Sequence, residues 1–255
     1  MSILSHYTRN KLYGSLLGMD TFEKPQTYIG LATAAPTDPP GTAVEPTGSD
    51  YNRVLYSKWS ITQNRKVSNS TTISFYSRSN WGTITHYLLW DAQEGGNLLG
   101  YGPLDSSVAV PTNKVISFSK GKLSFQVLSG TITNYLANVY LNHLFGITSL
   151  FPLSSCYVGM SYTNPGDTGH PVTPTVAEYH DVEFQGWNVT DDSTLLNASI
   201  VDFPIPASDW GILPYVFVRD GENRVLFYSA LVQPFPADPY SPVIFSTGDL
   251  SFIFD

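Results

Sequence analysis

The sequence contains one long segment twice. Asn10 matches Asn138, a shift of 128 residues, and later landmarks keep the same order at shifts of 127 to 129. A period this long indicates two copies of a domain, because solenoid repeat units run to about 20–50 residues. The strongest matches are residues 10–18 with 138–146, 79–82 with 208–211, and 121–125 with 248–252. We therefore expect a first β-rich repeat domain over residues 1–129 and a second over residues 130–255.

The composition favours strands over helices in both copies. The 255 residues include 20 Gly, 18 Pro, 16 Tyr and 14 Phe, whereas charged residues make up only 13%. Tyr and Phe are common in strands, and Gly and Pro are common in turns. We expect a mainly β protein of two tandem, similar, small antiparallel β-sandwich or barrel domains, with a helix content below about 20%.

Each copy is predicted to begin with one helix. In the second copy Thr133 is the expected N-cap, apolar residues follow at helical spacing, and Gly146 marks the end of the helix. The first copy repeats this pattern up to Gly18, although Gly14 weakens the interior of the helix by about 1 kcal/mol.

The clearest strand pattern lies at the end of each copy. Apolar and polar residues alternate over 116–119 and again over 123–127, with Lys120-Gly121 between the two stretches. The second copy repeats the pattern around Thr247-Gly248. This alternation predicts a β-hairpin in each copy, with one apolar and one polar face.

Charge and cysteine content exclude several classes of partner and location. The 13 basic and 21 acidic residues give a net charge of −8, which disfavours binding to nucleic-acid phosphates. No apolar run approaches the length of about 18 residues that spans a bilayer. Cys156 is the single cysteine, and residues 1–6 lack the features of a secretory signal. We expect a soluble protein made in a cytoplasm, with no nucleic-acid or membrane partner.

The sequence offers few candidates for catalysis. Asp167-Thr168-Gly169 spells the aspartic-protease triplet, but it lies in a turn-forming stretch and the first copy supplies no second triplet. Cys156 precedes a strand-like stretch and is interpreted as a small buried hydrophobic residue. No histidine recurs between the copies, and no nucleophile motif is present; the histidines are His6, His86, His143, His170 and His180. We predict no catalytic residues and do not expect an enzyme.

Motifs for metal, nucleotide and glycan attachment are equally weak. Asp191-Asp192 is an isolated acidic pair that fits a solvated turn, and Gly95-Gly96 fits a hairpin turn. Asn69, Asn188 and Asn197 begin glycosylation sequons, but these carry no weight without a signal peptide. We predict no metal ligands and no cofactor.

Four tryptophans recur at matched positions, Trp59 with Trp187 and Trp81 with Trp210. Exposed tryptophans would be platforms on which sugars stack, whereas buried ones would anchor the core. The loops of the two copies have diverged while these tryptophans recur, which favours structural anchors. Sugar binding stays the alternative.

Motifs in both copies carry a family resemblance. Residues 133–138 read Thr-Asn-Tyr-Leu-Ala-Asn and residues 143–146 read His-Leu-Phe-Gly; the other segments that carry it are 35–38, 45–54, 81–86 and 95–102. These segments resemble a family of small virion proteins of tailed bacteriophages that are commonly labelled tail-fibre-like. The resemblance implies no catalytic residues. The second copy departs from it at Asp181, Leu213-Pro214 and Glu222-Asn223.

The resemblance leaves two functions open. Proteins of this general kind also occur as capsid decoration, or cement, proteins, which stabilise a shell by binding across subunit junctions. We favour a non-catalytic decoration protein on the capsid surface that binds the major capsid protein and neighbouring copies of itself as a homo-oligomer. The alternative is a tail-fibre or tail-tip component that takes part in host adsorption, including glycan binding. The sequence does not identify the residues of the binding interface.

Overall fold

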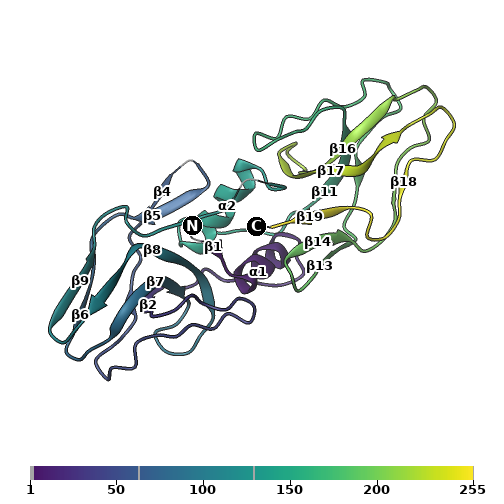
Figure 1. Ribbon diagram of the computed structural model, residues 1–255. Helices are drawn as coiled ribbons and strands as arrows, with labels where there is room; N and C mark the ends of the chain where they lie inside the picture. The colour runs from purple at the N-terminus through teal and green to yellow at the C-terminus, as the bar shows by residue number, and fades with distance from the viewer. Residues whose placement is uncertain (1–2, 63, 129, 255) are drawn as a thin grey trace. The chain divides into compact units, whose positions relative to one another are not determined.

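The computed structural model describes residues 3–62, 64–128 and 130–254, and its strands are antiparallel (Figure 1). Strands account for 39% of the described residues and helices for 9%, and each repeat carries one helix near its start. The predicted mainly β class, with its small helical part, is confirmed.

The first repeat builds three antiparallel sheets. Its elements are β1 (Ile3–Leu4), α1 (His6–Leu16), β2 (Tyr28–Ala32), β3 (Val54–Leu55), β4 (Trp59–Thr62), β5 (Lys66–Asn69), β6 (Ile73–Ser77), β7 (Gly82–Trp90), β8 (Leu98–Val110), β9 (Lys114–Phe118) and β10 (Ser124–Gln126). The strand orders are β1-β8-β7-β2-β3, β10-β5-β4 and β6-β9. Alternate residues of β6 are buried, as in a strand that packs one face on a core.

The second repeat builds the same arrangement. Its elements are α2 (Asn134–Leu144), β11 (Cys156–Ser161), β12 (Val182–Glu183), β13 (Trp187–Val189), β14 (Thr194–Asn197), β15 (Val201–Asp202), β16 (Ile212–Asp220), β17 (Val225–Pro236), β18 (Ile244–Phe245) and β19 (Ser251–Ile253). The strand orders are β12-β11-β16-β17, β13-β14-β19 and β15-β18. A single bridge between Ile132 and Phe227 stands where the first repeat has β1.

Strand registers show which residues of the two repeats are equivalent. In the β7–β8 hairpin Ile84 pairs with Val108, and in the β16–β17 hairpin Leu213 pairs with Phe235. Both hairpins shift register immediately after this pair, leaving four residues of the second strand bulged. Val108 and Phe235 are therefore equivalent, because each comes directly after the four bulged residues of the second strand.

The two helices begin and end in the same way. The hydroxyl oxygen of Ser5 accepts from the N–H of Thr8, and that of Thr133 accepts from the N–H of Leu136, so both residues are N-caps. At the other end, Gly18 and Gly146 have positive φ and lie in Schellman motifs that satisfy the last carbonyl groups. The helix ends predicted from Thr133, Gly18 and Gly146 are confirmed.

Contacts divide the chain into two compact units that interleave the repeats. The first unit is residues 1–12, 22–127 and 138–150, and the second is residues 13–21, 128–137 and 151–255. In the first unit the ring of Phe145, just after α2, lies 4.7 Å from the indole of Trp59. In the second unit Tyr13 of α1 lies 5.6 Å from the ring of Phe227. The aromatic core of each unit thus includes a residue from the helical segment of the other repeat.

The hairpin predicted for residues 116–127 is wrong in its pairing. β9 pairs with β6, and β10 pairs with β5, so the two stretches belong to different sheets. The predicted alternation itself agrees with the structure, since Ile116, Phe118 and Phe125 are buried. An alternating pattern identifies the face that meets the core, but it does not identify the partner strand.

The side chain of Asn69 lies between these two stretches and is fully buried. Its Oδ1 accepts a hydrogen bond from the N–H of Leu123 at 2.9 Å. Its amide group donates to the carbonyl oxygens of Thr71, Phe118 and Ser119. One amide side chain therefore satisfies the backbone groups that a β9–β10 hairpin would have paired.

The second repeat uses Asn197 in the same way. This residue is also fully buried, and its Oδ1 accepts from the N–H groups of Gly248 and Leu250. Its amide donates to the carbonyl oxygens of Ser199 and Ser246. The pairing error of the predicted hairpin thus occurs in both repeats for the same physical reason.

His143 is expected to make the stability of the protein depend on pH. Its Nε2 lies 2.7 Å from the carbonyl oxygen of Phe22, and its Nδ1 lies 3.0 Å from the N–H of Leu150. Burial lowers the pKa of His143 below its ordinary value. As the pH falls through about 6.5, His143 therefore binds a proton more readily in the unfolded chain than in the folded chain. The free energy of unfolding should decrease as the pH is lowered from about 7 to about 5.

Urea unfolding at pH 7 and pH 5 measures this effect. In His143→Gln the fall between the two pH values should be smaller than in the wild type by about 1 kcal/mol. His170 is exposed, so His170→Gln serves as the matched control and should keep the wild-type pH dependence. An unchanged pH dependence in His143→Gln would contradict the prediction.

Candidate functional site

A groove lies beside the bulge of the β7–β8 hairpin in the first repeat. The bulged part of β8, the end of β9 and the segment that follows β9 line a cavity of about 220 Å³. Its lining consists of Tyr87, Pro103, Leu104, Asp105, Ser106, Val108, Ser117, Phe118, Ser119, Lys122 and Leu123. A second hollow of about 510 Å³ shares Asp105 and Lys122 with this groove.

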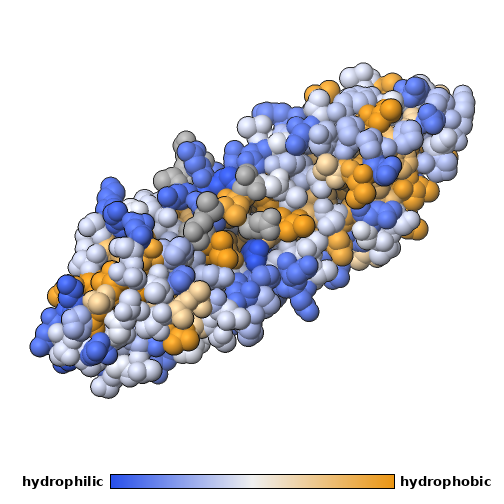
Figure 2. All heavy atoms as spheres, viewed as in Figure 1, coloured by the Kyte–Doolittle hydropathy of each residue, from blue (hydrophilic) through white to orange (hydrophobic). Residues whose placement is uncertain are grey.

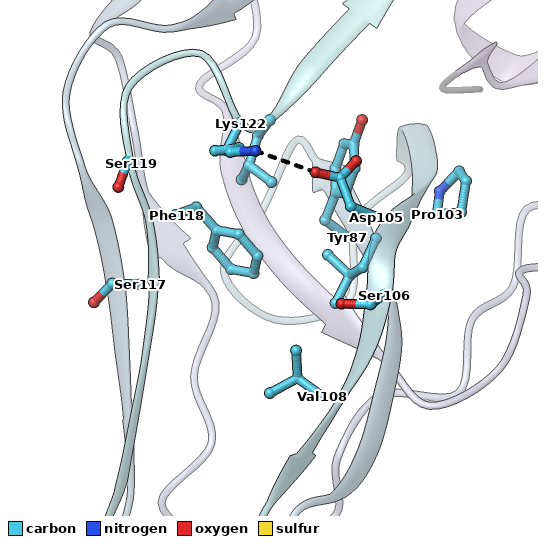
Figure 3. Close-up of a pocket in the computed structure, with 11 residues that line it drawn as sticks. Tyr87, Pro103, Asp105, Ser106, Val108, Ser117, Phe118, Ser119 and Lys122 are labelled. Atoms are coloured by element: carbon cyan, nitrogen blue, oxygen red, sulfur yellow. Dashed lines mark hydrogen bonds and ion pairs between the residues drawn. The ribbon is translucent and has the colours of Figure 1, made fainter.

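The groove has an apolar floor and a charged mouth. Figure 3 shows the ring of Phe118 pointing into the space between the two segments, with Val108 below it. At the mouth, Nζ of Lys122 lies 3.3 Å from Oδ2 of Asp105, and these side chains are 63% and 86% exposed. So exposed an ion pair contributes little to stability, and both groups are accessible to a ligand. The arrangement suits a ligand with an apolar face and polar edges, such as a sugar ring.

The second repeat has replaced the groove residues. Val232 stands where the first repeat has Asp105, and Asp249 stands where it has Lys122. Phe235, the counterpart of Val108, lies 5.6 Å from the ring of Phe245. The larger side chain packs over the floor that the valine leaves open, so the groove chemistry belongs to the first repeat.

A second cluster in the first repeat is built around Tyr51. The Tyr51 hydroxyl donates to Glu45 at 2.6 Å and accepts from the N–H of Leu31 at 2.7 Å. Arg53 pairs with Glu45, and its guanidinium carbon lies 3.8 Å from the ring centroid of Trp90. Burial, with the Glu45 charge as the next cause, raises the pKa of Tyr51 far above its ordinary value. This cluster joins a loop to the sheet and leaves no reactive group free.

The second repeat keeps this cluster with its charges rearranged. Tyr179 donates to Asp181 at 3.1 Å and accepts from the N–H of Met160 at 2.7 Å. Asp181 pairs with Arg219, whose guanidinium carbon lies 4.3 Å from the ring centroid of Tyr157. The departure seen in the sequence at Asp181 is therefore compensated from another strand, and the structural role is conserved.

The family of the podophage GP4 fiber I protein gp80 matches the sequence twice, over residues 3–126 and again over residues 131–253. The chain belongs to this gp80 family. No protein in the curated set matches it. The double match establishes a phage virion protein with two tandem repeats, and it agrees with the resemblance drawn from the sequence.

The residues weighed for catalysis have structural places in this gp80-family chain. Asp167 lies in a turn, where its carboxylate accepts a hydrogen bond from the hydroxyl of Tyr228 at 2.6 Å. Cys156 is 3% exposed, and burial raises the pKa of its thiol to about 12. That thiol is inert at neutral pH because the thiolate is the reactive form. Within the described ranges, no three His, Cys, Asp or Glu side chains are grouped to hold a metal ion.

The tryptophans of this gp80-family chain are buried, with exposed fractions between 1% and 8%. Trp210 illustrates their role, since its ring lies 5.1 Å from Tyr179 and its Nε1 donates to Glu178 at 3.4 Å. They are structural anchors, and the alternative of exposed stacking platforms is wrong. In the described part of the chain, no helix is long and apolar enough to cross a bilayer.

The groove of the first repeat was not predicted from the sequence. Asp105, Val108 and Lys122 match no known motif, and the groove depends on a bulge that a residue pattern does not reveal. One signal was present, because the repeats differ in charge and size at these aligned positions. Differences between the aligned positions of tandem copies can therefore reveal a surface groove that is present in one repeat alone.

Proposed function

We propose that the chain is a non-catalytic structural component of a phage tail fibre. The observation that carries this proposal is the match of both repeats to the fiber I gp80 family. The described structure supports a structural role, since Asp167 lies in a turn and pairs with Tyr228, and Cys156 is buried. The proposed location is the tail of the virion.

The groove of the first repeat is the proposed contact with a host saccharide. Phe118 and Val108 provide an apolar floor for the face of a sugar ring. Asp105 and Lys122 provide an acceptor and a donor for hydroxyl groups at its edge. The neutral sum of this pair favours a neutral saccharide over a strongly acidic one.

Capsid decoration is the second candidate function. The described helices α1 and α2 are only 11 residues long, too short for the coiled coil of a fibre shaft. A protein that binds the major capsid protein and its own copies across the shell needs no shaft. For this candidate the loss of the protein would weaken the shell against heat while adsorption to cells continued.

Immunogold labelling of intact virions separates the two candidates. An antibody against this chain should place gold on the tail or its tip if the fibre proposal is correct. Gold distributed over the heads would overturn that proposal and support a decoration protein. A strain that lacks the gene serves as the control for antibody specificity.

Filling the groove with a larger side chain should weaken saccharide binding. Val108→Phe introduces the side chain that the second repeat carries at the equivalent position, and it should weaken binding at least about tenfold by blocking the floor. The measurement is binding of purified protein to an array of bacterial surface polysaccharides.

The exposed Val232 allows a matched control in the second repeat. Val232→Ala should bind as the wild type does, and both variants should keep the wild-type circular dichroism spectrum. Equal binding by wild type and Val108→Phe would exclude the groove as the binding site, as would the absence of any bound polysaccharide. Neither binding result would bear on the location of the protein in the virion, which immunogold labelling tests separately.

A further inference from the structure

The groove of the first repeat adjoins the second hollow. The groove alone, at about 220 Å³, is smaller than the roughly 300–1,000 Å³ of most small-molecule sites, whereas the second hollow measures about 510 Å³. The two spaces share five lining residues, which are Tyr87, Pro103, Leu104, Asp105 and Lys122. They therefore meet at the Asp105–Lys122 ion pair, and a ligand longer than one sugar ring can occupy both.

The strand register places a polar row along the second hollow. Gln126 of β10 is the cross-strand partner of Lys66 of β5. Their neighbours Phe125 and Val67 are fully buried, so the alternation of a strand directs Ser124, Gln126 and Lys66 to the opposite face. These three residues line the second hollow. The Cβ atoms of cross-strand partners lie about 5 Å apart, so the amide of Gln126 and the ammonium of Lys66 are within reach of one ligand group.

The second hollow has more hydrogen-bond donors than acceptors. The ammonium groups of Lys66 and Lys122 only donate, and the amide of Gln126 and the hydroxyl of Ser124 add two more donor groups. Among the described residues that line this hollow, Asp105 is the one carboxylate. Two ammonium groups against one carboxylate give the lining a net charge of +1, whereas the ion pair at the mouth of the groove sums to zero. An ionised carboxylate or phosphate, whose oxygens accept hydrogen bonds, complements the second hollow.

The second repeat has lost the polar row as well as the groove. Thr194 and Ile253 are cross-strand partners at the positions that Lys66 and Gln126 hold in the first repeat. Ile253 is 47% exposed, so an apolar side chain replaces a polar one at the surface. Figure 2 shows further hydrophobic side chains gathered over the β18 end of the second repeat. The linings of the groove and of the second hollow thus differ between the repeats together, as expected for two parts of one site.

The negative charge of the whole chain comes from the second repeat. Residues 1–129 hold 11 basic and 8 acidic residues, a net charge of +3, whereas residues 130–255 hold 2 basic and 13 acidic residues, a net charge of −11. The repeat that carries the second hollow is therefore the one whose own charge attracts an anion.

We propose that the groove and the second hollow together bind an acidic saccharide. A neutral ring lies on the floor at Phe118, and an anionic group on the adjoining sugar, a carboxylate or a phosphate, is held by Lys66 and Gln126. The inference rests on the proposed saccharide function of the groove and specifies the class of ligand. The neutral Asp105–Lys122 pair lies where the two units join, so the ligand carries charge on one unit and hydroxyl groups on the other.

Binding to matched polysaccharides tests this ligand class. Each acidic bacterial surface polysaccharide is compared with its carboxyl-reduced form and with its dephosphorylated form. The wild-type protein should bind at least one acidic polysaccharide about tenfold more tightly than one of its two treated forms. The treatment that weakens binding shows whether the anionic group is a carboxylate or a phosphate. Equal binding of all three forms of every bound polysaccharide would overturn the inference.

Two variants test whether the polar row recognises the charge. Lys66→Gln removes the cation, and Gln126→Glu places a carboxylate opposite Lys66, so each should reduce the tenfold preference for the acidic form to about twofold or less. Lys58 is exposed and outside the lining of both spaces, so Lys58→Gln is the matched control and should keep the preference. All three variants should keep the wild-type circular dichroism spectrum. A full preference in both Lys66→Gln and Gln126→Glu would overturn the inference.

The failure of this inference is distinguishable from the failure of the proposed function. Val108→Phe blocks the floor and should weaken binding of the acidic and the treated forms alike, whereas Lys66→Gln should weaken binding of the acidic form alone. If Val108→Phe loses binding and the wild type shows no preference for the acidic form, the groove binds saccharide and the inference alone is wrong. If the wild type binds no polysaccharide, both are wrong.

Discussion

Replacing Asn197 with alanine is expected to lower the free energy of unfolding by about 4 kcal/mol. The substitution leaves the N–H groups of Gly248 and Leu250 and the carbonyl oxygen of Ser246 without their side-chain partner. Leu250 is 1% exposed, so water cannot replace the hydrogen bond that its N–H loses. Urea unfolding followed by tryptophan fluorescence measures the change.

Asn188 offers a control of the same residue type. It also begins a sequon, but its side chain is exposed in β13. Asn188→Ala should change the free energy of unfolding by no more than about 0.5 kcal/mol. A loss below about 1 kcal/mol in Asn197→Ala would show that the buried amide is not a structural centre of the second repeat.

Replacing Arg219 with alanine is expected to cost about 3 kcal/mol of stability. The side chain of Asp181 is 11% exposed, and its partner Arg219 is 19% exposed. Without the guanidinium the largely buried carboxylate loses its ion-pair partner, and the Tyr179 hydroxyl is the one side-chain donor left to it among the described residues. The stacking of Arg219 on Tyr157 is lost as well.

A double-mutant cycle separates the pair from its surroundings. Asp181→Asn removes the charge, so the double variant Asp181→Asn/Arg219→Ala should be less destabilised than the sum of the single changes, by at least about 1 kcal/mol. Lys122→Ala breaks the exposed pair with Asp105 and should cost less than about 0.5 kcal/mol. Additive single changes in the cycle would mean that Arg219 acts through packing alone.

Local patterns were enough to predict the two helices and the buried face of the strands that end each repeat, but not the partners of those strands. Thr133 and Gly146 predicted where α2 begins and ends, because caps act within a few residues of the chain. The alternation around Phe118 and Phe125 predicted the buried face. The pairing of those strands depends on Asn69, about 50 residues away along the chain, and no local pattern reveals such a contact.

The functional surface was less predictable than the fold. The sequons at Asn69 and Asn197 carried no weight in the sequence, and the role of these two side chains as buried hydrogen-bond centres required the structure. The departure at Asp181, where the first repeat has Arg53, could not be interpreted from the sequence, because the compensating Arg219 lies on a different strand. In all these cases the deciding partner is distant in sequence.

The exchange of helical segments has a consequence for ancestry. Phe145 from the second repeat completes the core around Trp59, and Tyr13 from the first repeat packs on Phe227. We expect a relative with a single repeat to obtain these rings by exchanging helical segments with a second copy, as in a domain-swapped dimer. Fusion of two such genes would turn an obligate pair of subunits into one polypeptide, and each half would then be free to acquire its own surface.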